Sequence, residues 1–182
     1  EVIEAIDTLK GQGPREFNEL CYELSAELLT MTNLCSSKEE AMALVNEKIS
    51  NGEALEKFKQ MIIYQGGNPE VVNDYGLFKS AKKLVEVKAK TEGYIKRVEA
   101  MDIGVGGMLL GAGRESKDDK IDYAVGVEVL KRVGDYVKVN DTLAILHSNE
   151  KNEIEAYNKV LNAYQITKET RAANPIILDY IR

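Results

Sequence analysis

Hydrophobic residues in the first part of the chain recur at intervals of three and four, which is the spacing of amphipathic helices. A first helix is predicted over 2–9. The run Gly11 to Pro14 ends it, because glycine permits unusual backbone angles and proline suits the first position of a new helix. A second helix, predicted from Pro14 to about Met31, carries an apolar stripe that we expect to face a core. The stripe consists of Phe17, Leu20, Cys21, Leu24, Leu28 and Met31.

Two further helices follow. Ser37 and Glu40 have the spacing of a capping box, in which each side chain accepts a hydrogen bond from a backbone N–H at a helix start. This predicts a third helix that Asn51-Gly52 closes. A fourth helix has inward residues between Ala54 and Ile62 and ends at Gly66-Gly67. The first 75 residues are therefore predicted to be helical.

After about residue 83 the helical spacing gives way to short runs rich in β-branched and aromatic residues, which predict strands. The predicted strands are 84–87, 93–98, 124–130, 136–139 and 142–147, with a last one over 175–181. A helix is expected between them over 154–164. We therefore predict an α+β fold, or the back half of a larger α/β protein, with a helical segment over 1–75 and an α+β lobe over 76–182.

The chain has 182 residues, of which 44% are hydrophobic, so a packed core is expected. Its net charge of −6 argues against nucleic acid or an anionic membrane as a primary partner. The sequence has neither an apolar run long enough to span a membrane nor the features of a signal peptide, which predicts a cytoplasmic location. The chain begins inside a predicted helix, and we therefore expect it to be a piece of a longer protein.

Few single residues suggest chemistry on their own. Cys21 and Cys35 lack the spacing of a zinc or redox motif and are expected to be reduced, mostly buried thiols. His147 ends a predicted strand without an evident partner, so a structural or surface role is favoured over proton transfer. Asp118-Asp119 falls in a polar loop, and a metal site there is disfavoured.

The region from Gly104 to Gly113 is rich in glycine, which invites a phosphate-binding interpretation. A dinucleotide fingerprint that began with Gly104 and Gly106 would need a third glycine at Leu109, and no Gly-Lys-Ser/Thr follows. The favoured interpretation is a helix whose small residues permit close packing.

The segment 131–146, together with 92–95, resembles the strand and turn pattern of biotinyl and lipoyl carrier domains. In those domains a lysine in a hairpin carries the cofactor. Here the strand is followed by His147, Ser148, Asn149 and Glu150, so the carrier lysine is missing. We expect the same small β architecture without the cofactor.

Several motifs taken together, in order along the chain, resemble the C-terminal part of pyrimidine-nucleoside phosphorylases of the thymidine phosphorylase class. They are Leu9 to Pro14, Tyr64 to Pro69, Asp102-Ile103-Gly104, Leu110 to Arg114, Ala124-Val125-Gly126 and Ile145 to Ser148. The resemblance implies an enzyme that cleaves uridine, thymidine or deoxyuridine with phosphate as co-substrate, yielding the free base and (deoxy)ribose 1-phosphate. It also implies a homodimer formed through an upstream helical domain.

In that family the phosphate and base ligands lie upstream of the part represented here. The resemblance therefore assigns no catalytic and no substrate-binding residue to this chain, and the 182 residues alone are expected to lack activity. One family site reaches the chain: a cation, expected to be potassium, held by backbone oxygens and a carboxylate. By position that carboxylate is Glu4, with Glu1 as the nearby alternative. The competing interpretation is that Glu4 is a solvated acid favoured by the helix dipole.

Two functions from different classes remain open. The first is the C-terminal segment of a pyrimidine-nucleoside phosphorylase, without a decision between uridine and thymidine. The second is a noncatalytic binding or carrier module built on the segment from Glu92 to Ser148.

Overall fold

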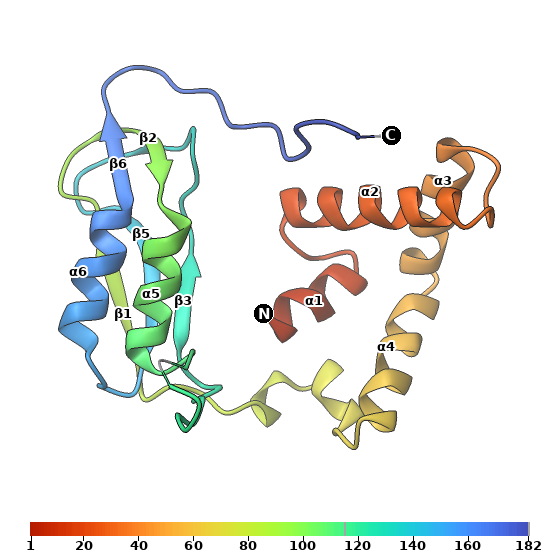
Figure 1. Ribbon diagram of the computed structural model, residues 1–182, viewed down its shortest axis with the longest axis horizontal. Helices are drawn as coiled ribbons and strands as arrows, with labels where there is room; N and C mark the ends of the chain where they lie inside the picture. Colours follow the sequence, from red (N-terminus) through yellow and green to blue (C-terminus); the bar gives the residue numbers. More distant parts are fainter. Residues whose placement is uncertain (115, 182) are drawn as a thin grey trace. The chain divides into compact units, whose positions relative to one another are not determined.

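A computed structural model describes residues 1–114 and 116–181 (Figure 1). The chain divides into two compact units. The helical unit comprises Glu1–Leu77 and the tail from Ile176, and the sheet unit comprises Phe78–Pro175. Among the described residues there are six α-helices and two three-stranded antiparallel sheets, which confirms a mixed α and β architecture.

The helical unit follows the predicted order of elements. They are α1 (Val2–Leu9), α2 (Arg15–Met31), α3 (Lys38–Ser50), α4 (Glu53–Tyr64) and the 3-10 helices η1 (Pro69–Val72) and η2 (Tyr75–Leu77). The predicted N-cap of α3 is confirmed, because Ser37 Oγ accepts a hydrogen bond from the Glu40 backbone N–H at 3.2 Å. The Glu40 carboxylate accepts from the backbone N–H of Ser36 at 2.8 Å, so the reciprocal arm of the box reaches one residue further back.

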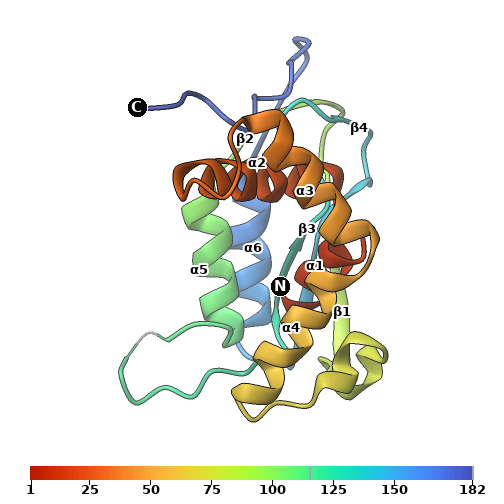
Figure 2. The same cartoon turned by 90° about the vertical axis from the view of Figure 1, so that its right-hand side faces the viewer.

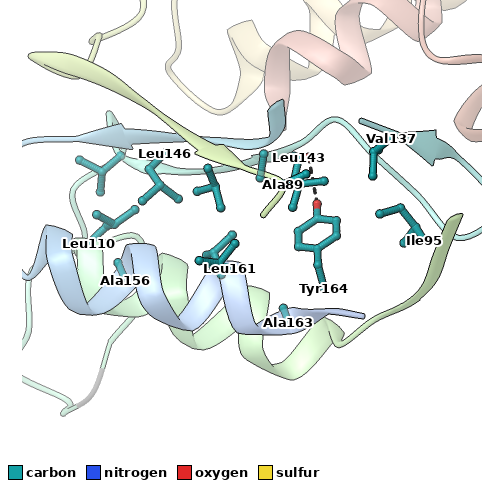
Figure 3. Close-up of a cluster of buried hydrophobic side chains, with 14 residues drawn as sticks. Ala89, Ile95, Leu110, Val137, Leu143, Leu146, Ala156, Leu161, Ala163 and Tyr164 are labelled. Carbon is teal, nitrogen blue, oxygen red and sulfur yellow. Dashed lines mark hydrogen bonds between the residues drawn. The ribbon is translucent and has the colours of Figure 1, made fainter. Parts of the chain in front are cut away.

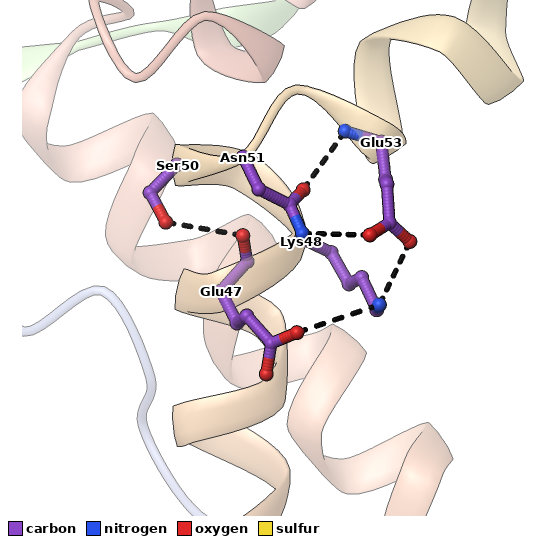
Figure 4. Close-up of polar contacts among 5 residues, drawn as sticks. All are labelled: Glu47, Lys48, Ser50, Asn51 and Glu53. Carbon is purple, nitrogen blue, oxygen red and sulfur yellow. Dashed lines mark hydrogen bonds and ion pairs between the residues drawn. The ribbon is translucent and has the colours of Figure 1, made fainter.

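The junction between α3 and α4 is a tight polar turn (Figure 4). Gly52 adopts a left-handed conformation with φ 81°, which explains the glycine. Asn51 Oδ1 accepts from the backbone N–H of Glu53 at 2.9 Å, and Lys48 Nζ lies 2.7 Å from the Glu53 carboxylate. Lys48 in the last turn of α3 and the C-cap residue Asn51 therefore both contact Glu53, the first residue of α4.

The core of the helical unit is small. Ala26, Cys35 and Ala41 form its buried cluster at the contact of α2 with α3, and Leu29 packs against them. The predicted core-facing stripe of α2 is wrong at its C-terminal end, because Leu24 and Leu28 are 55% and 61% exposed. The helix packs through its opposite face, where Ala26 permits a close approach to α3.

The sheet unit holds the predicted strands. Its elements are β1 (Lys83–Lys88), β2 (Gly93–Val98), α5 (Ala100–Leu110), β3 (Gly126–Val129), β4 (Tyr136–Val137), β5 (Thr142–Ser148), α6 (Glu153–Ala163) and β6 (Tyr164–Thr167). One sheet has the order β1-β5-β3 and the other β4-β2-β6, and every pair is antiparallel. The helices α5 and α6 lie side by side in both views (Figures 1 and 2).

Buried apolar side chains from both sheets and both helices form one core (Figure 3). Leu143 and Leu146 of β5 are both buried in this core, and Leu110 and Val160 contribute from α5 and α6. Tyr164 enters the same core, and its hydroxyl donates to the Leu143 backbone carbonyl at 3.0 Å (Figure 3). Burial raises the pKa of Tyr164 to about 12, so the phenol stays protonated and keeps this bond.

Two predictions about the C-terminal end are wrong. Tyr164, predicted as the last residue of a helix, begins β6, where it pairs with Val98. The predicted strand over 175–181 does not form within the described part of the tail, where Leu178 is 85% and Ile181 fully exposed. A strand needs a neighbouring edge for its backbone groups, and the tail pairs with none of the described strands.

Candidate functional site

The proposed cation ligand, Glu4, lies in the first turn of α1 and is half-buried. A carboxylate is a hard oxygen ligand that suits such an ion. Within 1–114 and 116–181, no group of three or more acidic, histidine or cysteine residues gathers to hold a metal by itself. The described residues therefore show no complete metal site around Glu4, and its role as a cation ligand stays a prediction.

The other end of α1 is closed by a packed turn. Thr8 Oγ1 and Asn18 Oδ1 are buried and have no hydrogen-bond partner among the described residues. Both crowd Gly13, where an added Cβ would lie 2.3 Å and 2.5 Å from them. Asn18 Nδ2 donates to the Gly13 carbonyl at 3.1 Å. This turn packs the C-terminal end of α1 against the first turn of α2.

A polar cluster joins α1 to η2. The Tyr75 hydroxyl donates to the Asp7 carboxylate and accepts from Lys10 Nζ at 3.2 Å. Lys10 Nζ also lies 4.8 Å from the centre of the Tyr75 ring. Burial and the Asp7 hydrogen bond raise the pKa of Tyr75 to about 12, so the phenol is a stable donor. The cluster therefore links α1, at the start of the helical segment, to η2 at its end.

The glycine-rich region forms a helix, as favoured from the sequence. Gly104, Gly106 and Gly107 lie within α5, and Gly111 caps it with φ 108°. Backbone amides in the body of a helix are already paired within it, so they do not form a phosphate cradle. Gly106 serves close packing, because a Cβ there would lie 2.5 Å from Val160 Cγ2 of α6.

The remaining sequence candidates make local structural contacts. His147 Nε2 lies 3.2 Å from the Glu128 carboxylate on the neighbouring strand β3, and both side chains are exposed. Asp119 accepts hydrogen bonds from Ser116 in its own loop. Cys21 and Cys35 are free thiols, half-buried and buried. None of these contacts assembles a nucleophile with a base.

A second polar cluster surrounds the turn from β5 into α6, and we call it the β5–α6 hub. Buried Ser148 donates to Glu153 at 2.6 Å, and Lys83 Nζ lies 2.8 Å from the same carboxylate. Asn149 Nδ2 donates to Asp122 at 2.7 Å. The Lys83 hydrogen bond and then that of Ser148 lower the pKa of Glu153. The four residues between Ser148 and Glu153 form the turn that leads from β5 into α6.

Two surface hollows occur in the sheet unit. One, of about 220 Å³, is bounded by Lys90, Leu143 and Tyr164, whose hydroxyl is already committed to a carbonyl. A more open one, of about 640 Å³, lies beside the hub at Lys83, Glu150 and Glu153. Sequence patterns did not indicate either hollow or the two polar clusters. Asp7 lies 68 residues from Tyr75, and Asp122 lies 27 from Asn149, so no spacing rule links them.

No helix among the described residues has both the length and the apolar composition that crossing a bilayer requires. The polar contacts described above stabilise the fold. Comparison with related proteins is therefore needed to identify the chemistry.

Residues 94–167 match the family described as the pyrimidine nucleoside phosphorylase C-terminal domain. The chain is 40% identical over 181 residues to a pyrimidine-nucleoside phosphorylase from Staphylococcus haemolyticus, which covers 100% of this chain and 41% of that protein. It is 41% identical over 172 residues to the Bacillus subtilis pyrimidine-nucleoside phosphorylase, which covers 94% of this chain and 40% of that protein.

The chain thus spans about two fifths of the length of these curated relatives. The matched domain is the C-terminal one, and it contains β2, α5, β3, β4, β5, α6 and β6. The resemblance predicted from the sequence is confirmed: the chain is similar, along its whole length, to the C-terminal portion of the pyrimidine-nucleoside phosphorylases.

Proposed function

We propose that the chain is the C-terminal segment of a pyrimidine-nucleoside phosphorylase, a pentosyltransferase of nucleoside salvage. The observation that carries this proposal is the 40% identity over 181 residues to proteins of that name. In the proposed reaction, an oxygen of inorganic phosphate forms a bond to C1′ of the sugar. The bond from C1′ to the base nitrogen breaks, and the base leaves with the electron pair and takes up a proton.

The proposed contribution of this chain is support. Residues 1–75 would belong to the large α/β domain and 76–182 to its C-terminal lobe, whose small sheets follow a biotinyl-like plan without a carrier lysine. The continuous core of the sheet unit supports such a role, because a rigid lobe holds reactants in position when an active site closes. The groups that bind phosphate and nucleoside would come from the upstream part.

Glu4 is proposed as one ligand of a bound potassium ion. The test is Glu4→Gln in the intact enzyme, with Glu19→Gln on the exposed side of α2 as the matched control. The Glu4 variant should need more potassium for half-maximal activity, whereas the control should behave like the unsubstituted enzyme. An unchanged potassium dependence of Glu4→Gln would remove this assignment.

The proposal extends to a cytoplasmic homodimer formed through the upstream helical domain, with a pyrimidine nucleoside and phosphate as its small-molecule partners. The exposed apolar side chains of the helical unit support further assembly, since exposed apolar patches commonly mark interaction sites.

The function is tested with the intact gene product, incubated with phosphate and either uridine or thymidine. Release of free base that depends on phosphate is expected, and comparison of kcat/KM for the two nucleosides gives the preference. If the intact protein releases no base from either nucleoside, the proposal fails and a noncatalytic binding module becomes the better account.

A further inference from the structure

Helix α2 presents an apolar seam to solvent. Phe17, Cys21, Leu24, Leu28 and Met31 recur at alternating intervals of four and three residues, which is the spacing by which one helix packs against another. Leu24 is 55%, Leu28 61% and Met31 75% exposed. Leu34, just beyond the end of α2, is also exposed. We call these six residues the α2 seam.

The seam is not the face by which α2 is held in the helical unit. That face carries Ala26, which is fully buried, and Leu29, both of which pack in the cluster shared with α3. A helix that is apolar on two opposite faces is expected to be covered on both. The face of α2 that carries the seam is therefore not covered by another described element of the helical unit.

Polar groups along the seam are already satisfied. Ser25 Oγ donates to the Cys21 carbonyl at 2.7 Å, and Thr32 Oγ1 donates to the Leu28 carbonyl at 2.8 Å. Because these hydroxyls bond to their own helix, a partner could remove water from this flank without leaving them unpaired. The flank is also lined by short side chains, which permits another backbone to approach.

The first turn of α1 is close to the seam. Residues 10–14 join α1 to α2, and Thr8 and Asn18 of the two helices meet at Gly13. Burial, and then the charge of the Glu4 carboxylate, raise the pKa of the Cys21 thiol, in agreement with this proximity. The neighbouring Val2 and Ile3 are 48% and 40% exposed. Polypeptide that enters α1 from upstream would therefore emerge beside the seam.

We propose that the α2 seam is the docking face for an amphipathic helix from the polypeptide that precedes Glu1 in the intact enzyme. The inference rests on the proposed function, in which an upstream part exists. Its support is that the chain covers only 41% of its relatives and matches their C-terminal domain. Covalent attachment beside the seam favours this occupant over a second copy, because it gives a high effective concentration.

The test uses cysteine labelling of the intact protein. Leu28→Cys is compared with Ile154→Cys, a control at a position on α6 that is 79% exposed. A maleimide under native conditions should label Leu28→Cys at least about tenfold more slowly than the control, because the site must open before it can react. Equal labelling rates would overturn the proposal. Mass spectrometry of the labelled peptides separates these sites from Cys21 and Cys35.

Two further measurements keep the result decisive. Met31→Cys replaces Leu28→Cys if the latter fails to fold, and hydrogen exchange of α2 in the unsubstituted protein should show protection that matches the labelling. A bismaleimide cross-link that joins Leu28→Cys of two copies would assign the seam to a second copy and overturn the proposal. Base release by the unsubstituted protein tests the proposed function separately, so failure of one is distinguishable from failure of the other.

Discussion

The two units of this chain bury their apolar residues to very different extents. In the sheet unit, strands and helices between Val87 and Tyr164 converge on one continuous core around Leu143, Leu146 and Val160. In the helical unit the buried cluster rests on Ala26, Cys35 and Ala41, while large residues such as Leu28 and Met31 remain exposed. The difference teaches that the sheet unit buries its large apolar residues in its own core, whereas the helical unit leaves several of them exposed.

The largest expected effect tests this contrast directly. Leu146→Ala should lower the free energy of unfolding by about 2–5 kcal/mol, because it leaves a cavity in the core of the sheet unit. Leu28→Ala in the same 182-residue chain should change it by less than about 0.5 kcal/mol, since that side chain is exposed. Urea denaturation measures both values. Similar costs for the two variants would break the comparison.

The second prediction sharpens the account of close packing within the sheet unit. Gly106→Ala should destabilise by about 1–3 kcal/mol, because the new Cβ would lie 2.5 Å from Val160 Cγ2. Gly104→Ala in the same helix meets nothing within 4 Å and should stabilise by about 0.5–1 kcal/mol through helix propensity. The midpoints of thermal unfolding should therefore move in opposite directions, and a shift of both in the same direction would contradict the packing role.

A smaller effect is expected in the helical unit, where local capping matters because the core is small. Ser37→Ala removes the acceptor for the Glu40 backbone N–H and should cost about 1 kcal/mol. Ser50→Ala, at the exposed end of the same helix, is the control and should change stability by less than about 0.5 kcal/mol. Far-ultraviolet circular dichroism during urea unfolding reports the helices. Equal costs for both variants would show that the cap is dispensable.

The smallest expected effect is on pH dependence. The pKa of Glu153 is lowered in the folded state by Lys83 and Ser148, so its contribution is present above the ordinary value of 4.5 and is lost as pH falls through the lowered pKa. Glu153→Gln should therefore flatten the loss of stability below pH 4.5, whereas Glu155→Gln, in the same helical turn, should keep the wild-type profile. Urea unfolding across this range tests the difference, and identical profiles would exclude the hub as a contributor.

The helices of the first unit could be predicted because their signals are local. The capping box at Ser37 and the left-handed Gly52 mark boundaries that any isolated segment would share. The same local pattern marked the α2 stripe as apolar, but periodicity states only that a face is to be covered. Whether Leu28 meets a neighbour depends on residues elsewhere, and the expectation of a core was wrong for that reason.

The sequence prediction at the C-terminal end of α6 was wrong for a related reason. Tyr164 continues the helical spacing of α6, yet its pairing with Val98 and its hydrogen bond to Leu143 involve residues far away in sequence. Of the candidate site, the glycine helix was predictable because its spacing excluded a phosphate loop. Glu4 as a cation ligand stays a prediction, since no group of three or more acidic, histidine or cysteine residues gathers to hold a metal among the described residues.

The hub also has a practical consequence for labelling the protein. The Asp122 backbone N–H donates to the Gly111 carbonyl at 2.9 Å, and Asn149 holds the Asp122 side chain, so the intervening loop is closed at its base. Because the ends of such a loop are already joined, lengthening it adds little closure entropy. A short peptide tag inserted after Lys117 should therefore leave the core of the sheet unit undisturbed and provide an internal handle for purification or fluorescence.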